Sequence, residues 1–251
     1  MTETDLKFNP GSIETRIVRD LEFFKLGHSG ETVRKIAGYV ELLTKWNIKY
    51  RFSKFRSSDD IYKNLIVVTF AHSVYIPETN SIIDIGSGPG IPGLVVSLIR
   101  QSTPVSCLDS STVSVEFMKY AKLSLDIPNL EIIQLRAEIL SHNPEYREKY
   151  GTAVARAFAP IPIVLETVSG LAARTDSRCN IVIQTPISSS HRYEKHTDSF
   201  HEIGVEFDKL ETPEFPHRDY PKVAFAIFSK TGVTPVRYPR KWSTMKKNPL
   251  F

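Results

Sequence analysis

The sequence predicts an α/β fold in which N-terminal helices precede a mostly parallel sheet that ends in an antiparallel pair of strands. Two observations support this prediction. Short β-branched runs alternate with helical segments between residues 81 and 184, as in a doubly wound parallel sheet. The last two strand-like runs, 205–210 and 223–228, are joined by a proline-containing loop without a helix, which is typical of antiparallel neighbours.

The N-terminal part, residues 1–72, is predicted to be helical. Ser12 follows Pro10 and Gly11 and can cap a helix over 13–24, where apolar residues recur at helical spacing. A second amphipathic helix is expected from residue 30 to about Trp46, and a third after Ser58. Because single helices of this length are unstable in water, their apolar stripes are expected to pack into the core.

Residues 73–230 are predicted to form the main domain, and residues 231–251 a C-terminal tail. Strands of the parallel part are expected at 81–85, 105–109, 130–135, 153–155 and 179–184, with helices at 94–99, 112–125 and 161–173. A parallel sheet closed in this way is the Rossmann-like architecture of class I S-adenosylmethionine-dependent methyltransferases. Ligands of such sheets bind outside the carboxyl ends of the strands, so the residues there are the candidate site.

The first strand runs directly into a glycine-rich turn, which reads Asp84-Ile-Gly-Ser-Gly-Pro-Gly-Ile-Pro-Gly93. Glycine at such a turn lets the backbone approach a ligand that a Cβ would exclude. The spacing Gly88-x-Gly90-x-x-Gly93 also fits a dinucleotide fingerprint. An acid at the end of the strand, however, suits the ammonium and sulfonium groups of S-adenosylmethionine. We therefore predict a cofactor site at Asp84, Gly86, Ser87, Gly88 and Gly90; the alternative is that the glycines only close a βα turn.

The next three strands also end in residues that suit this cofactor. Asp109 ends the second strand, where a carboxylate can accept hydrogen bonds from both hydroxyls of an adenosine ribose. Residues 136–138 (Arg-Ala-Glu) follow the third strand, where backbone and acid can hold the adenine edge. Arg156 ends the fourth and should face the reacting centre. Each has a structural alternative, since Asp109 could cap the next helix and Arg156 could pair with Asp84.

The net charge of +4 is located in the tail. Residues 231–251 contain five basic residues and no acidic ones, so the other 230 residues carry 27 basic and 28 acidic side chains. A localised basic segment is typical of binding to a polyanion. The candidate RNA-binding residues of the tail are Arg237, Arg240, Lys241, Lys246 and Lys247. The alternative is a tail that is merely solvated.

A second basic segment lies between Lys45 and Arg56, with five basic residues, four aromatic residues and no acid. Aromatic rings between cations suit base stacking and phosphate contact, which makes Lys45 and Arg51 further candidates for RNA binding. Equally, the aromatic rings could dock on the domain while the lysines and arginines are only solvated. The sequence leaves both interpretations open.

The composition of the 251 residues, 41% hydrophobic and 24% charged, suits one α/β domain with a full core. The sequence contains no apolar run of membrane-spanning length and no signal-like N-terminus, so we expect a cytoplasmic protein without a membrane partner. Cys107 and Cys179 lack the spacing of a zinc site or a disulfide framework and are expected to be buried, with no metal bound. We expect a monomer.

Several elements between about residue 30 and residue 250 resemble one known family. They are Lys45-Trp-Asn47, the glycine-rich turn, Leu108-Asp-Ser110, Arg136-Ala-Glu138, Arg156-Ala-Phe-Ala-Pro160, Tyr238-Pro-Arg240 and Lys246-Lys-Asn-Pro-Leu250. The sequence resembles a divergent member of the bacterial ribosomal RNA small subunit methyltransferase G family, also called glucose-inhibited division protein B. The resemblance implies methylation of N7 of a guanosine in 16S ribosomal RNA, either naked or in the small subunit. It also implies cofactor contacts at Gly86, Ile91, Ala137, Glu138 and Arg156, the last also being the candidate catalytic residue.

The sequence departs from the family pattern on the expected substrate side, at residues 51–53, 65–69, 112–114 and 184–185. Two alternatives therefore stay open. The chain could be a class I methyltransferase of the same ancestry that acts on another RNA or a small molecule, or an rRNA-binding factor without catalysis. The chemistry tolerates such replacements, because guanine N7 already has an in-plane lone pair and needs no general base to attack a methyl group.

Overall fold

The computed structural model describes residues 12–156, 158–175, 178–187 and 193–251. Its sheet has seven strands in the order β3-β2-β1-β4-β5-β7-β6. Neighbours among β1 to β5 are parallel, and β7 is antiparallel to both β5 and β6. This confirms the predicted class I methyltransferase fold. The strands are β1 (Ile82–Ile85), β2 (Val105–Asp109), β3 (Leu130–Gln134), β4 (Thr152–Arg156), β5 (Ile181–Thr185), β6 (Val205–Glu211) and β7 (Ala224–Lys230).

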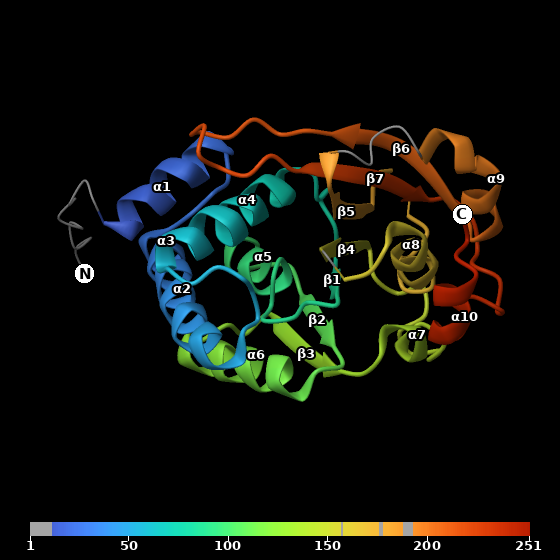
Figure 1. Cartoon of the computed structure of the whole chain (residues 1–251), viewed down its shortest axis with the longest axis horizontal. Coiled ribbons are helices and arrows are strands. Elements are labelled where there is room, and N and C mark those ends of the chain that lie inside the picture. The colour runs from blue at the N-terminus through green and yellow to red at the C-terminus, as the bar shows by residue number, and fades with distance from the viewer. Residues whose placement is uncertain (1–11, 157, 176–177, 188–192) are drawn as a thin grey trace.

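Helices cover both faces of the sheet, with α1 to α6 on one side and α7 to α9 on the other (Figure 1). The helices are α1 (Ile13–Phe23), α2 (Gly30–Tyr50), α3 (Ser58–Ile61), the π-helical η1 (Tyr62–Ile66), α4 (Val67–Val74), α5 (Gly93–Ile99), α6 (Thr112–Ser124), α7 (Ala137–Leu140), α8 (Ile161–Ser169), the 3-10 helix η3 (Tyr193–His196), α9 (Thr197–Glu202) and α10 (Trp242–Lys247). A separate hydrophobic core fills each side. Neighbouring residues of a central strand therefore enter different cores, as Ile82 and Ile83 do.

Serine residues cap the helices where the sequence indicated a start. The side chains of Ser12, Ser29, Ser57 and Ser111 each accept a hydrogen bond from the backbone N–H three residues later. This satisfies one of the donors that the first turn of a helix leaves unpaired. The predicted beginnings of α1, α2 and α6 are confirmed, whereas α3 begins at Ser58 and is capped by Ser57, one residue earlier than predicted. Pro10 and Gly11, which also entered the prediction for α1, lie outside the described residues.

Several predicted helix boundaries were wrong. α2 continues to Tyr50 instead of ending at Trp46, and Arg51 stops it in the left-handed region at φ 55°. α8 ends at Ser169 instead of at residue 173, because the backbone of Leu171 and Ala173 pairs with Tyr150 in a short bridge. The short helices α7, α9 and α10 were not predicted at all, since each has too few turns for a full amphipathic pattern.

The two cysteines differ in their surroundings. Cys107 lies on β2 and is buried, as expected. Cys179 is only half-buried and precedes β5 in the left-handed region at φ 63°, so the prediction of a buried strand residue was wrong there. Its backbone N–H donates to the Ser229 hydroxyl at 2.9 Å, outside the ladder of the sheet.

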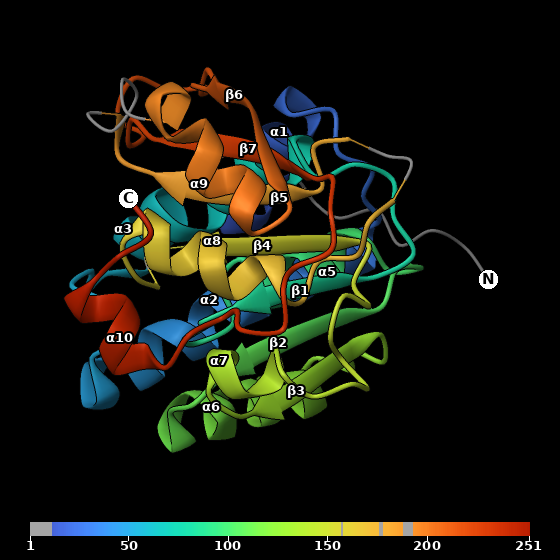
Figure 2. The same ribbon diagram turned by 90° about the vertical axis from the view of Figure 1, so that its right-hand side faces the viewer.

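Both ends of the described chain pack against the domain. Asp20 on α1 is fully buried and accepts hydrogen bonds from the hydroxyls of Tyr62 and Tyr220, at 2.8 and 2.7 Å. At the other end, Tyr238 and Met245 of the tail are buried. The tail therefore lies along the domain instead of extending freely into solvent, and α10 reaches the carboxyl edge of the sheet (Figure 2).

Candidate cofactor and substrate site

The glycine-rich turn after β1 is held tightly against β2. Gly86, Gly88 and Gly90 adopt φ values of 70°, 54° and 98°, in a region that other residues rarely enter. The backbone N–H groups of Gly86 and Ser87 both donate to the Leu108 carbonyl, at 2.8 and 3.1 Å. The turn therefore presents a fixed backbone surface at the carboxyl edge of the sheet.

Asp84 lies at the base of this turn and is fully buried. Its Oδ2 accepts a hydrogen bond from the Gly93 N–H at 2.8 Å, whereas Oδ1 finds no partner among the described residues. Burial raises the pKa of Asp84 to about 7, although the Gly93 N–H favours the charged form. A buried carboxylate with an unpartnered oxygen suits a cation or a donor placed nearby.

Asp109 at the end of β2 is bonded to the same turn. Its Oδ2 accepts from the Gly88 N–H at 2.8 Å, and its Oδ1 accepts from the Ser111 N–H at 2.7 Å. The cap of α6 is Ser111, so the alternative of Asp109 as the helix cap is not what the structure has. Each carboxylate oxygen keeps a further lone pair for a ribose hydroxyl.

The third predicted element completes a narrow cleft. Ala137 begins α7 and is buried, and Glu138 accepts a hydrogen bond from Arg136 Nε at 2.6 Å. The cleft has a volume of about 150 Å³. Its lining comprises Gly86, Leu108, Asp109, Ser110, Leu135, Arg136, Ala137, Glu138, Phe158 and Trp242.

The donors and acceptors of this cleft fit S-adenosylmethionine, but its size does not in the present arrangement. Sites for ligands of this class usually enclose about 300–1,000 Å³. A Cβ added at Gly86 would lie 2.2 Å from Cδ2 of Phe158, so the Phe158 ring fills the space that the glycine leaves open. The Phe158 ring therefore narrows the cleft beside Gly86.

Arg156 ends β4 on the far side of the turn, and its guanidinium donates to backbone carbonyls of the π-helical segment η1. The acceptors are the carbonyl oxygens of Asn64 at 3.0 Å and Leu65 at 3.4 Å. The alternative of an ion pair with Asp84 is therefore not what the structure has. Burial lowers the pKa of Arg156 to about 10. Ala157, the next residue of this motif, lies outside the described residues.

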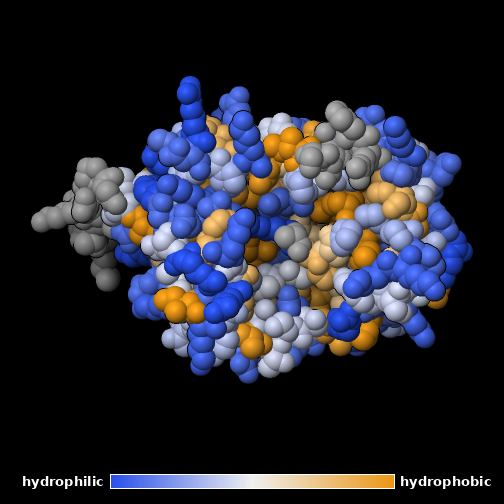
Figure 3. Space-filling model, in the orientation of Figure 1, coloured by the Kyte–Doolittle hydropathy of each residue, from blue (hydrophilic) through white to orange (hydrophobic). Residues whose placement is uncertain are grey.

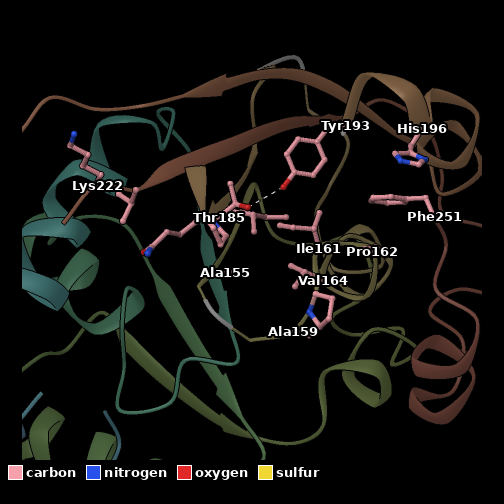
Figure 4. Close-up of a pocket in the computed structure, with 15 residues that line it drawn as sticks. Ala155, Ala159, Ile161, Pro162, Val164, Thr185, Tyr193, His196, Lys222 and Phe251 are labelled. Atoms are coloured by element: carbon pink, nitrogen blue, oxygen red, sulfur yellow. Dashed lines mark hydrogen bonds between the residues drawn. The ribbon is translucent and has the colours of Figure 1, made fainter. Parts of the chain in front are cut away.

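A larger pocket of about 750 Å³ opens beyond the carboxyl ends of β4 and β5 (Figure 4). Its walls include Ile161, Val164, Ile183 and Val223, and apolar surface gathers near the centre of this face (Figure 3). At one end, the rings of His196 and Phe251 stack with centroids 4.5 Å apart. The pocket is therefore an apolar slot with aromatic surface at its entrance.

The polar groups of this pocket are few. The Thr185 and Tyr193 hydroxyls share a hydrogen bond of 3.0 Å (Figure 4). Gln184 also lines the pocket, and its Oε1 is buried without a partner among the described residues. A carboxamide can donate and accept at the same time, so Gln184 can pair with the edge of a planar base.

The basic residues of the tail divide into two groups. Arg240 is bound to the fully buried Glu166, with its Nε at 2.9 Å and its Nη2 at 2.7 Å from the carboxylate, and Arg237 pairs with Glu202 at 2.8 Å. Both guanidinium groups are therefore committed to partners within the protein, which the sequence did not predict. Exposed side chains on and beside α10 are Lys241, Lys246 and Lys247.

The aromatic residues of the other basic segment dock on the domain. Trp46 and Phe52 both pack against the buried Phe117, with ring centroids 5.3 Å away in each case. Lys45 is exposed and pairs with Glu41 one turn earlier on α2. Arg51 is exposed after the end of that helix. The structure thus favours docking for these rings, and leaves the cations at the surface.

The part of the chain that the structure describes has no helix that is long and apolar enough to cross a membrane. Within the same residues, no group of three or more His, Cys, Asp or Glu side chains is placed to hold a metal ion.

Comparisons of the sequence with known proteins point to one family. A family model described as rRNA small subunit methyltransferase G (GidB) matches residues 32–181. The protein of that name from Acetivibrio thermocellus is 27% identical over 251 residues, which covers 100% of both chains. The one from Oenococcus oeni is 29% identical over 215 residues, 84% of this chain and 87% of its own. Among solved structures, an rRNA methylase from Streptococcus thermophilus aligns with a TM-score of 0.44 and 13% identity, over 66% of this chain and 95% of that one.

Proposed function

The chain belongs to the rRNA small subunit methyltransferase G family, and on that premise we propose that it transfers the methyl group of S-adenosylmethionine to N7 of a guanosine in 16S ribosomal RNA. The observation that carries this proposal is that the residues matched by the family model include most of those that line the cleft. The matched residues 32–181 contain the glycine-rich turn, Asp109 and Glu138, which line one cleft at the carboxyl edge of the sheet, and Arg156, which ends β4 at the same edge.

In this proposal the backbone of Gly86, Ser87, Gly88, Gly90 and Ile91 would hold the cofactor. Asp109 would accept hydrogen bonds from the ribose hydroxyls, and Ala137 with Glu138 would contact the adenine edge. The unpartnered Oδ1 of Asp84 lies beneath the turn, where a positive charge on the cofactor would be favourable. The bound cofactor supplies an activated methyl group; the chain supplies its position.

The protein contributes to the reaction by aligning the reacting atoms and by excluding water. Because N7 of guanine attacks through an existing lone pair, we assign no general base. A fixed line of nucleophile, methyl carbon and sulfur can account for several orders of magnitude in rate. Arg156 ends β4 at the carboxyl edge of the sheet and braces the π-helical segment η1 through its hydrogen bonds to the carbonyls of Asn64 and Leu65. We assign it the role of shaping the reacting centre.

We place the guanine in the apolar pocket beyond β4 and β5. Its apolar walls suit a planar base, and Gln184 contributes a carboxamide to the lining that can hydrogen-bond to a base edge. Exposed cations then hold the RNA backbone around this entrance. We retain Lys45, Arg51, Lys241, Lys246 and Lys247 for that role, while Arg237 and Arg240 act by fixing the tail to the domain. The division into a helical region (1–72), a methyltransferase domain (73–230) and a basic tail (231–251) forms part of the proposal.

The test is methyl transfer in vitro from labelled S-adenosylmethionine to small ribosomal subunits from cells that lack this gene. Mass mapping then identifies the modified nucleotide. We expect one 7-methylguanosine in 16S ribosomal RNA. Transfer to a different base, or no transfer by a protein that binds the cofactor, would contradict the proposed reaction and favour another substrate.

A further inference from the structure

The cofactor cleft has an aromatic wall that comes from the C-terminal tail. Trp242, the first residue of α10, lines the cleft together with Gly86, Asp109 and Glu138. Its side chain is half-buried, although it is surrounded in sequence by exposed basic residues. The tail therefore contributes to the cleft as well as to the surface.

Two contacts hold the indole over the cleft. The ring of Phe158 lies 5.7 Å from that of Trp242, at an interplanar angle of 51°. The guanidinium carbon of Arg136 is 5.1 Å from the centre of the indole. Arg136 also binds Glu138, so Trp242 is linked through Arg136 to the side chain that borders the adenine position. Residues from three separate parts of the chain thus meet above the turn.

The base of α10 is anchored independently of these aromatic contacts. The buried Glu166 accepts hydrogen bonds from the backbone N–H and the guanidinium of Arg240, two residues before Trp242. Met245, one turn into α10, is buried in the same region of the fold. The position of Trp242 is therefore fixed from both sides, as a preformed wall requires.

We propose that Trp242 is a cofactor-binding residue whose indole packs against the adenosine of S-adenosylmethionine. The cleft holds about 150 Å³ with Phe158 resting on Gly86. When Phe158 leaves that position, the space between Asp109 and Glu138 opens beside the indole, and the planar adenine of the adenosine takes the place of the Phe158 ring. This inference rests on the proposed function, because that function supplies the cofactor.

The placement of the ring favours the cofactor over the RNA as its ligand. Trp242 lines the narrow cleft beside Gly86 and Asp109, and it is absent from the lining of the larger pocket in which we place the guanine. The exposed lysines of the tail are candidates for contact with RNA, whereas the indole lines the cofactor cleft. A single short helix thereby touches both ligands of the reaction.

Fluorescence tests this assignment directly, because the chain has two tryptophans. The Trp46→Phe variant leaves Trp242 as the reporter, and the Trp242→Phe variant leaves Trp46, which packs on Phe117 away from the cleft. Titration with S-adenosylhomocysteine should change the emission of Trp46→Phe in a saturable way and leave that of Trp242→Phe unchanged. The reverse pattern would overturn the inference.

Calorimetry adds an affinity that does not depend on emission. Trp242→Ala should bind S-adenosylhomocysteine about tenfold more weakly than the wild type, and Trp242→Phe should lose less, because a phenyl ring still stacks. Thermal melting checks that each variant is folded. If Trp242→Ala does not fold, the affinity of Trp242→Phe and the emission of Trp46→Phe test the role of Trp242 instead.

The inference and the proposed function can fail separately. Wild-type affinity in Trp242→Ala, with cofactor binding otherwise intact, would overturn only the role of Trp242. Absence of any binding to the wild type would overturn both.

Discussion

The carboxyl edge of the sheet has two halves that differ in construction. At the ends of β1 to β3, which form the cofactor half, polar side chains are held by the backbone of nearby loops. At the ends of β4 and β5, which form the substrate half, apolar side chains from distant segments enclose an open pocket. Asp84 and Asp109 bind N–H groups of the turn that follows β1. Gln184, in contrast, has an oxygen without a partner among the described residues, and Phe251 comes from the end of the chain. The turn and the acidic residues of the cofactor half are therefore positioned locally, and the tail adds Trp242 at its edge, whereas the substrate half is enclosed by segments that are far apart in the sequence.

The largest expected effect concerns the anchor of the tail. Arg240→Ala leaves the buried carboxylate of Glu166 without its guanidinium partner, and breaking such a pair costs about 3 kcal/mol or more. Denaturant unfolding should report this loss. Arg237→Ala, whose partner Glu202 is exposed, should change the free energy of unfolding by less than about 1 kcal/mol. Equal effects of the two substitutions would contradict a tail fixed through Glu166.

The second-largest effect is expected from a substitution in the glycine-rich turn after β1. A Cβ at Gly93 would lie 2.5 Å from Cys107 Sγ and 2.7 Å from Cβ of Asp84, so Gly93→Ala should lower the free energy of unfolding by about 1–3 kcal/mol. It should also weaken cofactor binding. Gly27→Ala is the matched control, because a Cβ there meets nothing within 4 Å. A thermal melt of Gly93→Ala that matches the wild type would show that the turn is less tightly packed than we describe.

The substrate half can be separated from the cofactor half by Gln184→Ala. We expect kcat/KM for ribosomal subunits to fall about tenfold, the value of one or two lost hydrogen bonds to a base. Cofactor affinity measured by calorimetry should stay unchanged. Stability should not fall, because the substitution removes an oxygen that lacks a partner. A parallel loss of cofactor affinity would mean that the two halves are not independent.

A smaller effect is expected in the pH dependence of stability and of cofactor affinity. Burial raises the pKa of Asp84 in the folded protein to about 7. Asp84 therefore contributes fully to the free energy of unfolding below its unfolded pKa of about 4, and this contribution is lost as the pH rises through 7. A cationic ligand favours the charged form, so affinity for S-adenosylmethionine should rise several-fold between pH 6 and pH 8. Asp84→Asn should remove this rise. At saturating cofactor, kcat should be flat across the same range, because N7 needs no general base.

The smallest expected effects belong to the exposed lysines of α10. Lys246→Ala and Lys247→Ala should each reduce the slope of log affinity for RNA against log salt concentration by about one, without changing the stability of the fold. Lys209→Ala is a suitable control, because Lys209 lies on β6 and pairs with Glu211. Equal slopes for all three variants would place the RNA elsewhere on the surface.

The same contrast explains which features the sequence could predict. The turn from Asp84 to Gly93 and the strand end at Asp109 follow from residues within one or two elements, and the parallel sheet follows from the alternation of strands and helices. Trp242 and Phe251 could not be assigned, because their positions depend on contacts such as that between Arg240 and Glu166, which are 74 residues apart. A lone tryptophan within a basic tail was the only available signal. The partners of Arg156 were missed because the π-helical segment η1 has no recognisable pattern.

The most direct test of the locally built cofactor half is a calorimetric titration of the whole chain and of Asp109→Asn with S-adenosylmethionine. The substitution keeps the size of the side chain and removes its charge and one acceptor. We predict saturable binding with one site in the wild type, and an affinity at least about tenfold lower in Asp109→Asn. Equal affinities for the two proteins would contradict the assignment of the cofactor to the cleft between β1, β2 and β3.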